Sequence, residues 1–354
     1  MSLREIGFAL ARPLLHKMDA EQAHGLTISA LKSGLGGSRP LPAASALPVK
    51  LFGITFPNPL GLAPGFDKNA EVPDAMLAQG FGFVEIGTVT PKPQTGNPRP
   101  RLFRLIEDQA VINRMGFNND GHAVVFARLE ARRNAEGIVG VNIGANKDSS
   151  DRIADYVLGI EKFRSLISYV TINISSPNTP GLRNMQGREE LLRLLSACNA
   201  MRKQAVPMLL KIAPDLTQED LSDVAQVCEQ EALDGVIISN TTISRATLNS
   251  RYRSESGGLS GKPLFDLSTR QLATFYQMTG GRIPLVGVGG ISNAETAWAK
   301  ICAGASLIQL YSALVYQGPA LVAEIISGLQ NKMRAAGFSK LQDAVGYQKG
   351  LEGK

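Results

Sequence analysis

Side chains that could bind a small anionic ligand follow most of the apolar runs in this sequence, at the point where each run ends. They comprise two lysines, several amides and many hydroxyls, in the segments Pro64–Lys68, Gly87–Thr88, Asn142–Gly144, Asn173–Thr179, Lys211, Asn240–Thr241, Gly287–Gly290 and Tyr311–Ser312. Because carboxylates are few, the set suits neither glycoside hydrolysis, which needs two facing acids, nor a divalent metal. It indicates instead hydrogen-bonded binding of a planar, amide-bearing anion.

Glycines near two of these run ends could bring backbone N–H groups close to a phosphate. They lie in Gly257–Gly261 after the sixth run and in Gly289–Gly290 after the seventh, and Tyr311–Ser312 follows the eighth. Two familiar phosphate motifs do not explain them. Gly287–Ser292 lacks the acidic residue that a dinucleotide fingerprint has about twenty positions further on. Gly261–Pro263 has proline where a P-loop needs a hydroxyl.

Eight short apolar runs predict eight buried strands, and their near-continuous apolarity is typical of parallel strands covered on both faces. They are Asn58–Gly65, Phe83–Val89, Ile138–Gly144, Tyr169–Ser175, Met208–Pro214, Gly235–Thr241, Pro284–Gly290 and Leu307–Ser312. Helix signals lie between them, such as the cap Thr217 and the capping-box pattern Ser292-x-x-Glu295. This alternation predicts an α/β fold, a (β/α)₈ TIM barrel whose active site lies at the carboxyl ends of its strands. A doubly wound sheet is the alternative, which eight regular units disfavour.

The composition excludes several other classes of protein. The 354 residues are 44% hydrophobic, which is enough for a full core. The net charge of +6 suits anionic partners of several kinds, namely a membrane surface, phosphates or nucleic acid, and does not choose between them. Three cysteines and three histidines, without a C-x-x-C pair, argue against a disulfide framework, an iron–sulfur cluster and a multi-histidine metal site. No apolar run reaches the length of a spanning helix, and no secretory signal is recognisable.

The segment before residue 58 predicts two amphipathic helices. One face of the first carries four large apolar residues, Leu3, Ile6, Leu10 and Leu14. Pro13 is expected to bend or end this helix, and the second is expected to run from its cap at Asp19 to Gly34. Such a pair could pack on the barrel as a lid, or form a membrane-surface anchor with a tunnel for a lipid-like substrate. This stretch by itself leaves both alternatives open.

The run ends, taken together, resemble those of a known family, the membrane-associated, quinone-dependent (class 2) dihydroorotate dehydrogenases. The matching stretches lie within residues 45–335 and are Asn58–Lys68, Glu85–Pro91, Pro98–Asn119, Asn173–Leu182, Lys211–Asp215, Asn240–Thr242, Gly257–Pro263 and Gly287–Ile291. The resemblance implies a flavoenzyme that oxidises (S)-dihydroorotate to orotate in pyrimidine biosynthesis. Flavin mononucleotide (FMN) would accept the hydride, and membrane ubiquinone or menaquinone would take the electrons.

The same resemblance implies roles for individual residues. Ser176 is expected to be the catalytic base that removes the substrate's C5 proton while a hydride leaves C6. The residues expected to bind orotate are Lys68, Asn113, Arg114, Met115, Gly116, Phe117, Asn173, Asn178, Asn240 and Thr241. The residues expected to bind FMN are Pro64, Gly65, Phe66, Asp67, Lys68, Thr88, Asn142, Asn173, Lys211 and Ser239, with Gly261, Gly290, Tyr311 and Ser312 around its phosphate. No metal is expected.

The chemistry of the individual residues supports some of these implied roles better than others. Lys211 suits stabilisation of negative charge on a reduced flavin ring, because a strand lysine is costly to bury without a purpose. Ser176 would otherwise be interpreted as a turn serine, since a hydroxyl is a weak base without an activating partner. Pro64 stands where the family is expected to have alanine, and it has no N–H to donate to the flavin.

Serine at position 176 also favours class 2, because the soluble class 1 enzymes have cysteine there. The chain's own cysteines, Cys198, Cys228 and Cys302, are expected to lie in or near helices and to serve packing.

A flavin barrel that reduces uridine in transfer RNA is an alternative enzyme. It would need a catalytic cysteine and an RNA-binding domain, and neither is evident. A membrane-bound scaffold is the non-enzyme alternative, and it would not need the polar side chains at the ends of the eight apolar runs.

The resemblance also implies an organisation and a location for the whole chain. Residues 1–40 are expected to form a helical membrane and quinone-tunnel module, 41–338 the FMN-binding barrel, and 339–354 a polar C-terminal tail. The protein is expected to lie as a monomer on the cytoplasmic face of a bacterial membrane, or on the mitochondrial inner membrane if it is eukaryotic. Its N-terminal helices would touch the lipid, and no nucleic acid would bind.

Overall fold

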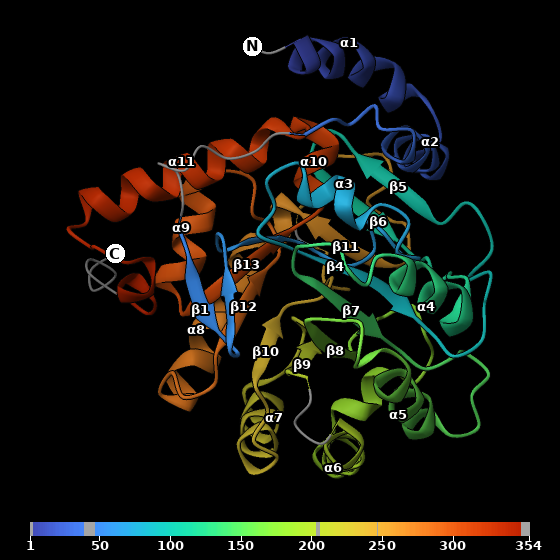
Figure 1. Ribbon diagram of the computed structural model, residues 1–354, viewed down its shortest axis with the longest axis vertical. Coiled ribbons are helices and arrows are strands. Elements are labelled where there is room, and N and C mark those ends of the chain that lie inside the picture. Colours follow the sequence, from blue (N-terminus) through green and yellow to red (C-terminus); the bar gives the residue numbers. More distant parts are fainter. Residues whose placement is uncertain (1–2, 39–46, 203–205, 246, 348–354) are drawn as a thin grey trace.

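Eight parallel strands close into a barrel at the centre of the molecule, as the sequence predicts (Figure 1). The computed structural model describes residues 3–38, 47–202, 206–245 and 247–347. The strands follow the order β10-β12-β13-β3-β4-β7-β8-β9 around the barrel. They are β3 (Leu60–Leu62), β4 (Phe83–Val89), β7 (Val139–Ile143), β8 (Tyr169–Asn173), β9 (Met208–Ile212), β10 (Gly235–Ile238), β12 (Leu285–Val288) and β13 (Ala305–Leu310). Each overlaps one of the eight predicted runs, so the predicted fold class is confirmed.

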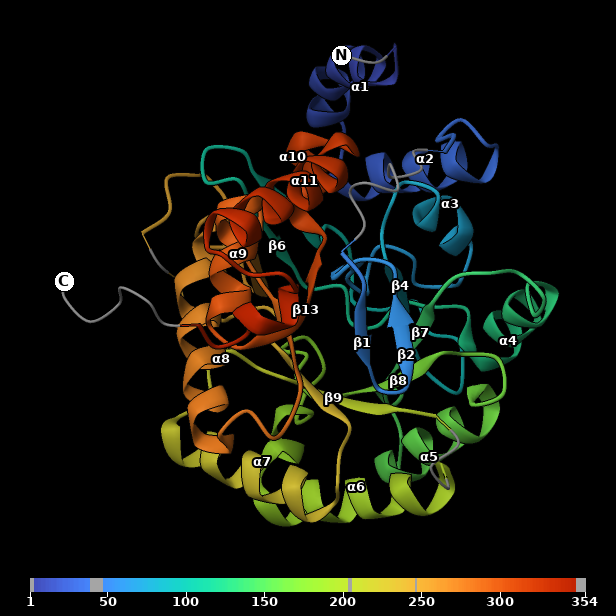
Figure 2. The ribbon, with the colours of Figure 1, turned by 60° about the vertical axis from the view of Figure 1, so that its left-hand side comes forward.

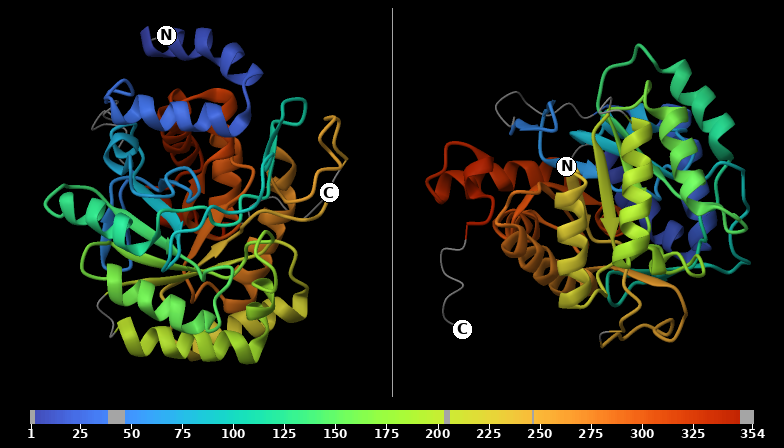
Figure 3. Two further views of the ribbon diagram at one scale, coloured as in Figure 1. Left: turned by 90° about the vertical axis from the view of Figure 1, so that its right-hand side faces the viewer. Right: turned by 90° about the horizontal axis from the view of Figure 1, so that it is seen from below.

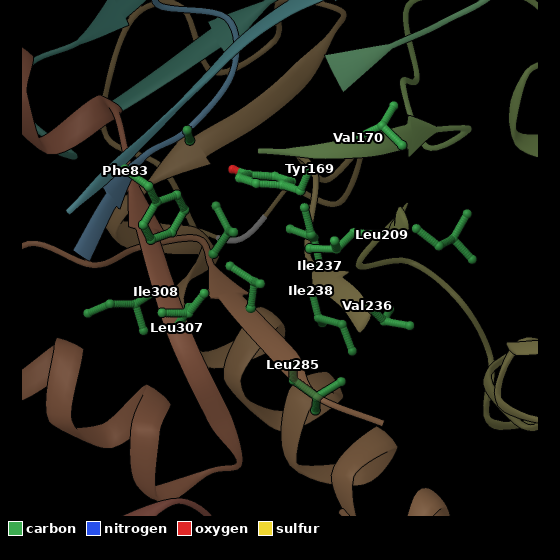
Figure 4. Packing of buried hydrophobic residues seen from close by; sticks show 14 of the residues in the cluster. Phe83, Tyr169, Val170, Leu209, Val236, Ile237, Ile238, Leu285, Leu307 and Ile308 are labelled. Carbon is green, nitrogen blue, oxygen red and sulfur yellow. The ribbon is translucent and has the colours of Figure 1, made fainter. Parts of the chain in front are cut away.

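The barrel interior changes from apolar to polar along the strands. Alternate residues of a strand share a face, so on β4 Phe83 is followed inward by Glu85, and on β9 Leu209 is followed by Lys211. Figure 4 shows the apolar packing around Phe83, Tyr169 and Leu209. The carboxyl end of the barrel therefore carries polar groups on a rigid apolar base.

Helices cover the outside of the barrel and join successive strands. They are α3 (Pro73–Leu77), α4 (Gly121–Ala131), α5 (Arg152–Phe163), α6 (Arg188–Arg202), α7 (Gln218–Gln230), α8 (Phe265–Thr279), α9 (Ala294–Cys302), α10 (Ser312–Gln317) and α11 (Ala320–Ala335). The predicted cap Thr217 forms a capping box with Asp220 at the start of α7. The predicted box Ser292-x-x-Glu295 is wrong: α9 is capped one residue later, where the Asn293 side chain accepts from the N–H of Thr296. Asparagine is at least as good an N-cap residue as serine, which is consistent with Asn293 rather than Ser292 at the N-cap of α9.

Short elements close the two ends of the barrel. The hairpin of β1 (Val49–Leu51) and β2 (Ile54–Phe56) covers the amino end, where the rings of Phe56 and Phe83 lie 5.2 Å apart. A three-stranded sheet of β5 (Leu102–Leu105), β6 (Ala110–Asn113) and β11 (Gly258–Gly261) stands at the carboxyl end. The 3₁₀ turns are η2 (Arg183–Gln186), η3 (Lys262–Leu264) and η4 (Leu341–Ala344). The carboxyl end thus gains its walls from outside the eight regular units.

The two predicted N-terminal helices are present as α1 (Leu3–Lys17) and α2 (Ala20–Lys32). Figures 2 and 3 show them, in dark blue, on the side of the barrel opposite α5–α7. The expectation that Pro13 bends or ends the first helix is wrong in part, since α1 continues through it to Lys17. Asp19 caps α2 as predicted, accepting from the N–H groups of Glu21 and Gln22. The side chains of Leu3, Ile6 and Leu10 lie outside the described part of the structure, whereas Leu14 is exposed.

Ionic and polar contacts attach these helices to the barrel. Glu21 of α2 forms an ion pair with Arg101, at 2.7 Å, and with Arg99. The guanidinium group of Arg12 donates to the carbonyl of Tyr316 at 2.9 Å, and that of Arg104 donates to two carbonyls at the end of α1. The helix pair is therefore fastened to the carboxyl end of the barrel at several separate points.

The C-terminal residues pack on the barrel as far as they are described. In the stretch predicted as a polar tail, η4 buries Leu341 and Ala344 in the main core. The ring of Tyr347 packs edge-on against Phe338 with centroids 4.8 Å apart. Residues 348–354 of the predicted tail lie outside the described residues. The stretch 339–347 thus contributes to the core although its composition is polar.

Candidate active site

A cavity of about 900 Å³ opens at the carboxyl ends of the barrel strands and continues between the barrel and the N-terminal helices. Most of the predicted site residues line it: Pro64, Gly65, Phe66, Lys68, Thr88, Asn113, Met115, Gly116, Phe117, Asn173, Ser176, Asn178, Lys211, Ser239, Asn240, Thr241, Gly261, Gly290, Tyr311 and Ser312. Residues of α1 and α2 line the same space. One volume therefore joins the polar strand ends to an apolar passage under the helices.

Three predicted site residues do not line this cavity. Asp67 is buried in its own turn, where its carboxylate accepts from the N–H groups of Asn69, Glu71 and Val72, and burial raises its pKa. Its role is to shape the turn that presents Lys68. Asn142 lies one layer below the cavity. The third residue, Arg114, turns outward.

Arg114 is held at the surface side of its loop. Its guanidinium group forms an ion pair with Glu255 at 2.7 Å and stacks over the ring of Phe103, 4.6 Å from the centroid. Its backbone N–H donates to the carbonyl of Arg101. These contacts fix the loop of Asn113 and Phe117, so Arg114 supports the cavity wall without forming part of it.

The glycines predicted to surround a phosphate lie together at one end of the cavity. Gly261 and Gly290 have φ angles of 94° and 75°, which favour glycine. A Cβ on Gly290 would lie 2.4 Å from the Cβ of Phe265, so no other residue fits there. The hydroxyls of Ser260 and Ser312 are 2.8 Å apart beside them. Backbone N–H groups and hydroxyls therefore lie together at this end of the cavity, where an anionic group could bind.

A chain of hydrogen bonds fixes the amides on the floor of the cavity. The Thr88 hydroxyl donates to Oδ1 of Asn142 at 2.5 Å, and Nδ2 of Asn173 donates to both groups at 2.9 and 3.0 Å. Oδ1 of Asn173 in turn accepts from the Ser175 hydroxyl and from Nδ2 of Asn240. Each amide has its donor and acceptor ends assigned by its neighbours, so the floor is pre-organised.

Beneath these amides lies a polar layer made of Glu85, Asn142, Tyr169, Lys211 and Gln309. Glu85, wholly buried, accepts from Asn142 at 2.8 Å, from the Tyr169 hydroxyl at 3.1 Å and from Gln309 at 2.7 Å. Burial lowers the pKa of Lys211, and the charge of Glu85 acts against that change. Oε1 of Gln309 has no hydrogen-bond partner among the described residues although the residue lines the cavity. Glu85, Tyr169 and Gln309 were missed as functional residues.

The predicted substrate residues lie across the cavity from one another. Nδ2 of Asn178 donates to Oδ1 of Asn113 at 3.3 Å, which joins the two loops that carry them. Ser176 is 5% exposed, and its Oγ accepts from the N–H of Asn178 at 3.2 Å. Within the described ranges, the Ser176 hydroxyl has no histidine or carboxylate partner. The ammonium group of Lys68 donates to the carbonyl of Gly65 at 2.8 Å, and burial lowers its pKa to about 8.

An aromatic cluster forms the junction between the barrel and α2. The rings of His24 and Phe66 are perpendicular, with centroids 5.4 Å apart, and Tyr311 packs on Phe66 at 5.6 Å. The Tyr311 hydroxyl lies 3.4 Å from Nδ1 of His24. Burial, and then the charge of Lys68, lower the pKa of His24 to about 3, so this imidazole is neutral at neutral pH. His24 was not predicted from the sequence, because nothing local marks a histidine on an amphipathic helix as a cavity residue.

Other chemistries find little support in the described residues. Cys198 and Cys228 are buried in α6 and α7, where burial raises the pKa of each thiol, and Cys302 is half-buried in α9, which agrees with the predicted packing role. No cluster of three potential metal ligands occurs within the described ranges. Of the helices that the structure describes, none combines the length and apolarity needed to cross a membrane.

Known proteins similar to this chain share most of its length. A family model described as dihydroorotate dehydrogenase matches residues 46–333. Curated relatives named dihydroorotate dehydrogenase (quinone) include one from Parvibaculum lavamentivorans, 61% identical over 96% of this chain and 98% of its own length. Another, from Brucella melitensis, is 56% identical over 94% of each chain. A crystal structure of DHODH from Eimeria tenella in complex with ferulenol is 38% identical, with a TM-score of 0.88, over 94% of this chain and 98% of its own.

Proposed function

This chain belongs to the dihydroorotate dehydrogenase family, and from that premise we propose how its cavity oxidises (S)-dihydroorotate to orotate and passes the electrons to a quinone. The protein is a quinone-dependent dihydroorotate dehydrogenase, an oxidoreductase of pyrimidine biosynthesis. The observation that carries the mechanism is the single cavity, lined both by the polar strand ends and by the N-terminal helices. The substrate and the quinone can then both reach the flavin within one cavity.

We propose FMN as the flavin of this family member. The residues present fit it: the glycines and serines at one end suit a terminal phosphate, and the unpaired Oε1 of Gln309, a residue that lines the cavity, could accept from an N–H of the flavin ring. Lys211 lines the same cavity from the polar layer beneath the amide floor, where a lysine could stabilise negative charge on the flavin ring. When bound, the flavin supplies a hydride acceptor that can later release its electrons to a quinone. Pro64 lines the cavity without an N–H, so that position contributes shape only.

The substrate is proposed to lie between the loops of Asn113 and Asn178, above the amide floor. The amides of Asn113, Asn178 and Asn240 match the donors and acceptors of a dihydropyrimidine ring, and the hydroxyl of Thr241 lies beside them. Lys68, half-buried and positively charged below its pKa, suits the carboxylate of the substrate. Asn178 holds Ser176 through its backbone N–H, so the residue that binds the ring also positions the proposed base.

Electrons are proposed to leave through the aromatic junction of Phe66, Tyr311 and His24. This cluster separates the polar floor from the passage under α1 and α2 and touches both. A quinone is largely apolar, and the passage is lined by small and apolar side chains such as Ala11, Ala23 and Ala30. Exposed Leu14 of α1, which does not line the cavity, would contact lipid, so the protein is proposed to bind the membrane peripherally.

The purified protein is expected to be yellow and to be bleached by dihydroorotate under anaerobic conditions. The flavin should then be reoxidised rapidly by ubiquinone or menaquinone analogues and only slowly by fumarate or NAD, because the passage favours apolar acceptors. Absorbance spectroscopy of the flavin band measures both steps. Bleaching by NADPH in place of dihydroorotate would contradict the proposed substrate, and fast reoxidation by NAD would contradict the proposed acceptor.

Substrate binding is expected to weaken at alkaline pH because of Lys68. Burial lowers its pKa to about 8, so its ammonium group is charged below that pH and loses its proton above it. The value of kcat/KM for dihydroorotate should therefore be constant below pH 8 and fall by about tenfold per pH unit above it. In Lys68→Arg the guanidinium group keeps its charge, so this decline should move to much higher pH. A decline that stays near pH 8 in Lys68→Arg would assign it to another group.

A further inference from the structure

Glu85 stands out as a buried carboxylate to which the mechanism above gives no role. It lies on β4, inside the barrel, and its side chain is fully excluded from solvent. Oε1 accepts from Asn142, and Oε2 accepts from Tyr169 and Gln309, so three neutral donors surround it. An isolated buried carboxylate is costly, and neutral hydrogen bonds offset only part of that cost.

A buried basic side chain lies in the same polar layer. Lys211 lies on β9 and lines the cavity, and Glu85 is the charged group that opposes the effect of burial on its pKa. Besides these two, Tyr169 is the only titratable side chain of the polar layer, and burial followed by the charge of Glu85 raises its pKa well above the usual value. The layer therefore contains one acidic and one basic side chain, both buried.

The carboxylate also decides which way the amides point. Because both oxygens of Glu85 can only accept, Asn142 must turn its Nδ2 toward it and its Oδ1 upward. That Oδ1 accepts from Thr88 and from Nδ2 of Asn173, so Asn173 presents its Oδ1 toward Asn240. The donor and acceptor pattern of the cavity floor thus follows, bond by bond, from one acceptor below it.

We propose that Glu85 is the positioning residue of the flavin site, the counter-charge that keeps Lys211 cationic and the acceptor that sets the orientation of Asn142 and Asn173. This inference rests on the proposed function, because it assigns Lys211 to the flavin. Glu85 does not touch the cavity, and it acts through the residues that do. Its loss is therefore expected to change the pH dependence of the flavin rather than only the amount of folded protein.

The test compares the holoenzyme with Glu85→Gln. Glutamine keeps the shape and can still accept from Asn142, while Gln309 can turn its amide to pair with the new NH₂ group. At saturating dihydroorotate, the rate of flavin reduction in stopped-flow should decline at alkaline pH. In Glu85→Gln that decline should begin about one to three pH units lower than in the wild type, because Lys211 loses its counter-charge.

Two comparisons make the result specific. Thr171→Val removes a buried hydroxyl from the same barrel interior without a change of charge, so its pH profile should match the wild type. Lys211→Met should lack the alkaline decline. A Glu85→Gln profile that equals the wild type overturns the inference while the proposed function stands. Failure of dihydroorotate to bleach the wild type refutes the function instead.

A stability measurement covers the case in which Glu85→Gln does not hold flavin. If the two charges compensate each other, removing both should be less harmful than removing one. The double variant Glu85→Gln/Lys211→Met should then melt at a higher temperature than Lys211→Met, which leaves Glu85 buried without a cation. A double variant that melts no higher than Lys211→Met overturns the inference.

Discussion

Replacing Ser176 by alanine is expected to leave flavin bound and to slow flavin reduction by dihydroorotate by about 10²–10⁴-fold, the usual contribution of a general base. The reason is positional. Ser176 is the hydroxyl that the loop after β8 presents to the cavity between Asn178 and the amide floor, and it is almost fully buried. A proton taken from substrate carbon there has few other acceptors, since the neighbouring amides are already paired.

The measurement is anaerobic stopped-flow at saturating substrate, which separates the chemical step from binding. The flavin-to-protein ratio of Ser176→Ala should equal that of the wild type, because no flavin contact is proposed for this side chain. Ser176→Cys is the matched variant: its side chain has a similar size and, once its thiol has ionised, the thiolate can accept the proton, so it should retain more of the rate than alanine does. Near-normal reduction by Ser176→Ala would remove this residue from the mechanism.

Deleting residues 1–40 is expected to abolish most quinone turnover and to spare orotate formation with a small water-soluble acceptor. The helices form the wall of the apolar passage, whereas the amide floor belongs to the barrel. They also carry the exposed Leu14, which does not line the cavity and would contribute about 1.5–3 kcal/mol on leaving water for lipid. In the proposed function, a long-chain quinone would lose both its passage and its contact with the membrane surface when the helices are removed.

Steady-state assays with a long-chain quinone in vesicles and with a soluble dye separate the two activities. The deletion also breaks the ion pairs of Glu21 with Arg99 and Arg101, so thermal melting must show that the barrel remains folded. The variant Leu14→Glu changes an exposed residue that does not line the cavity, so it should reduce turnover only in the vesicle assay. If the deletion lowers dye reduction and quinone turnover equally, the helices have a structural role alone.

Much of the site was predictable because it lies at strand ends. In a parallel barrel the carboxyl ends of all strands meet at one face, so short polar segments after apolar runs must converge. Lys68, Asn173, Ser176 and Tyr311 lie hundreds of positions apart at the extremes, and they line one cavity as that rule requires. The eight apolar runs predicted the eight strands, because a strand that is buried on both faces has few polar positions.

Other features were not accessible in this way. Glu85 lies inside a predicted strand, where a lone acid carries no signal, and its partners Tyr169 and Gln309 are 84 and 224 positions away. The helix start at Asn293 rather than Ser292 depended on which of two adjacent capping residues met the backbone geometry. Arg114 matched a family motif, but its side chain turns outward and binds Glu255. That partner is 141 positions away in the sequence, so no local pattern could indicate it.

The amino-acid sequence by itself determined the barrel, the family and the chemical types at the strand ends, because hydrophobic periodicity and local capping act over a few residues. Only the tertiary structure decided that these ends share a cavity with α2, that His24 meets Tyr311, and that one carboxylate orients the amide floor. These arrangements depend on contacts between residues far apart in the sequence. In the buried interior electrostatic interactions are stronger than in water, and each polar group has few possible hydrogen-bond partners.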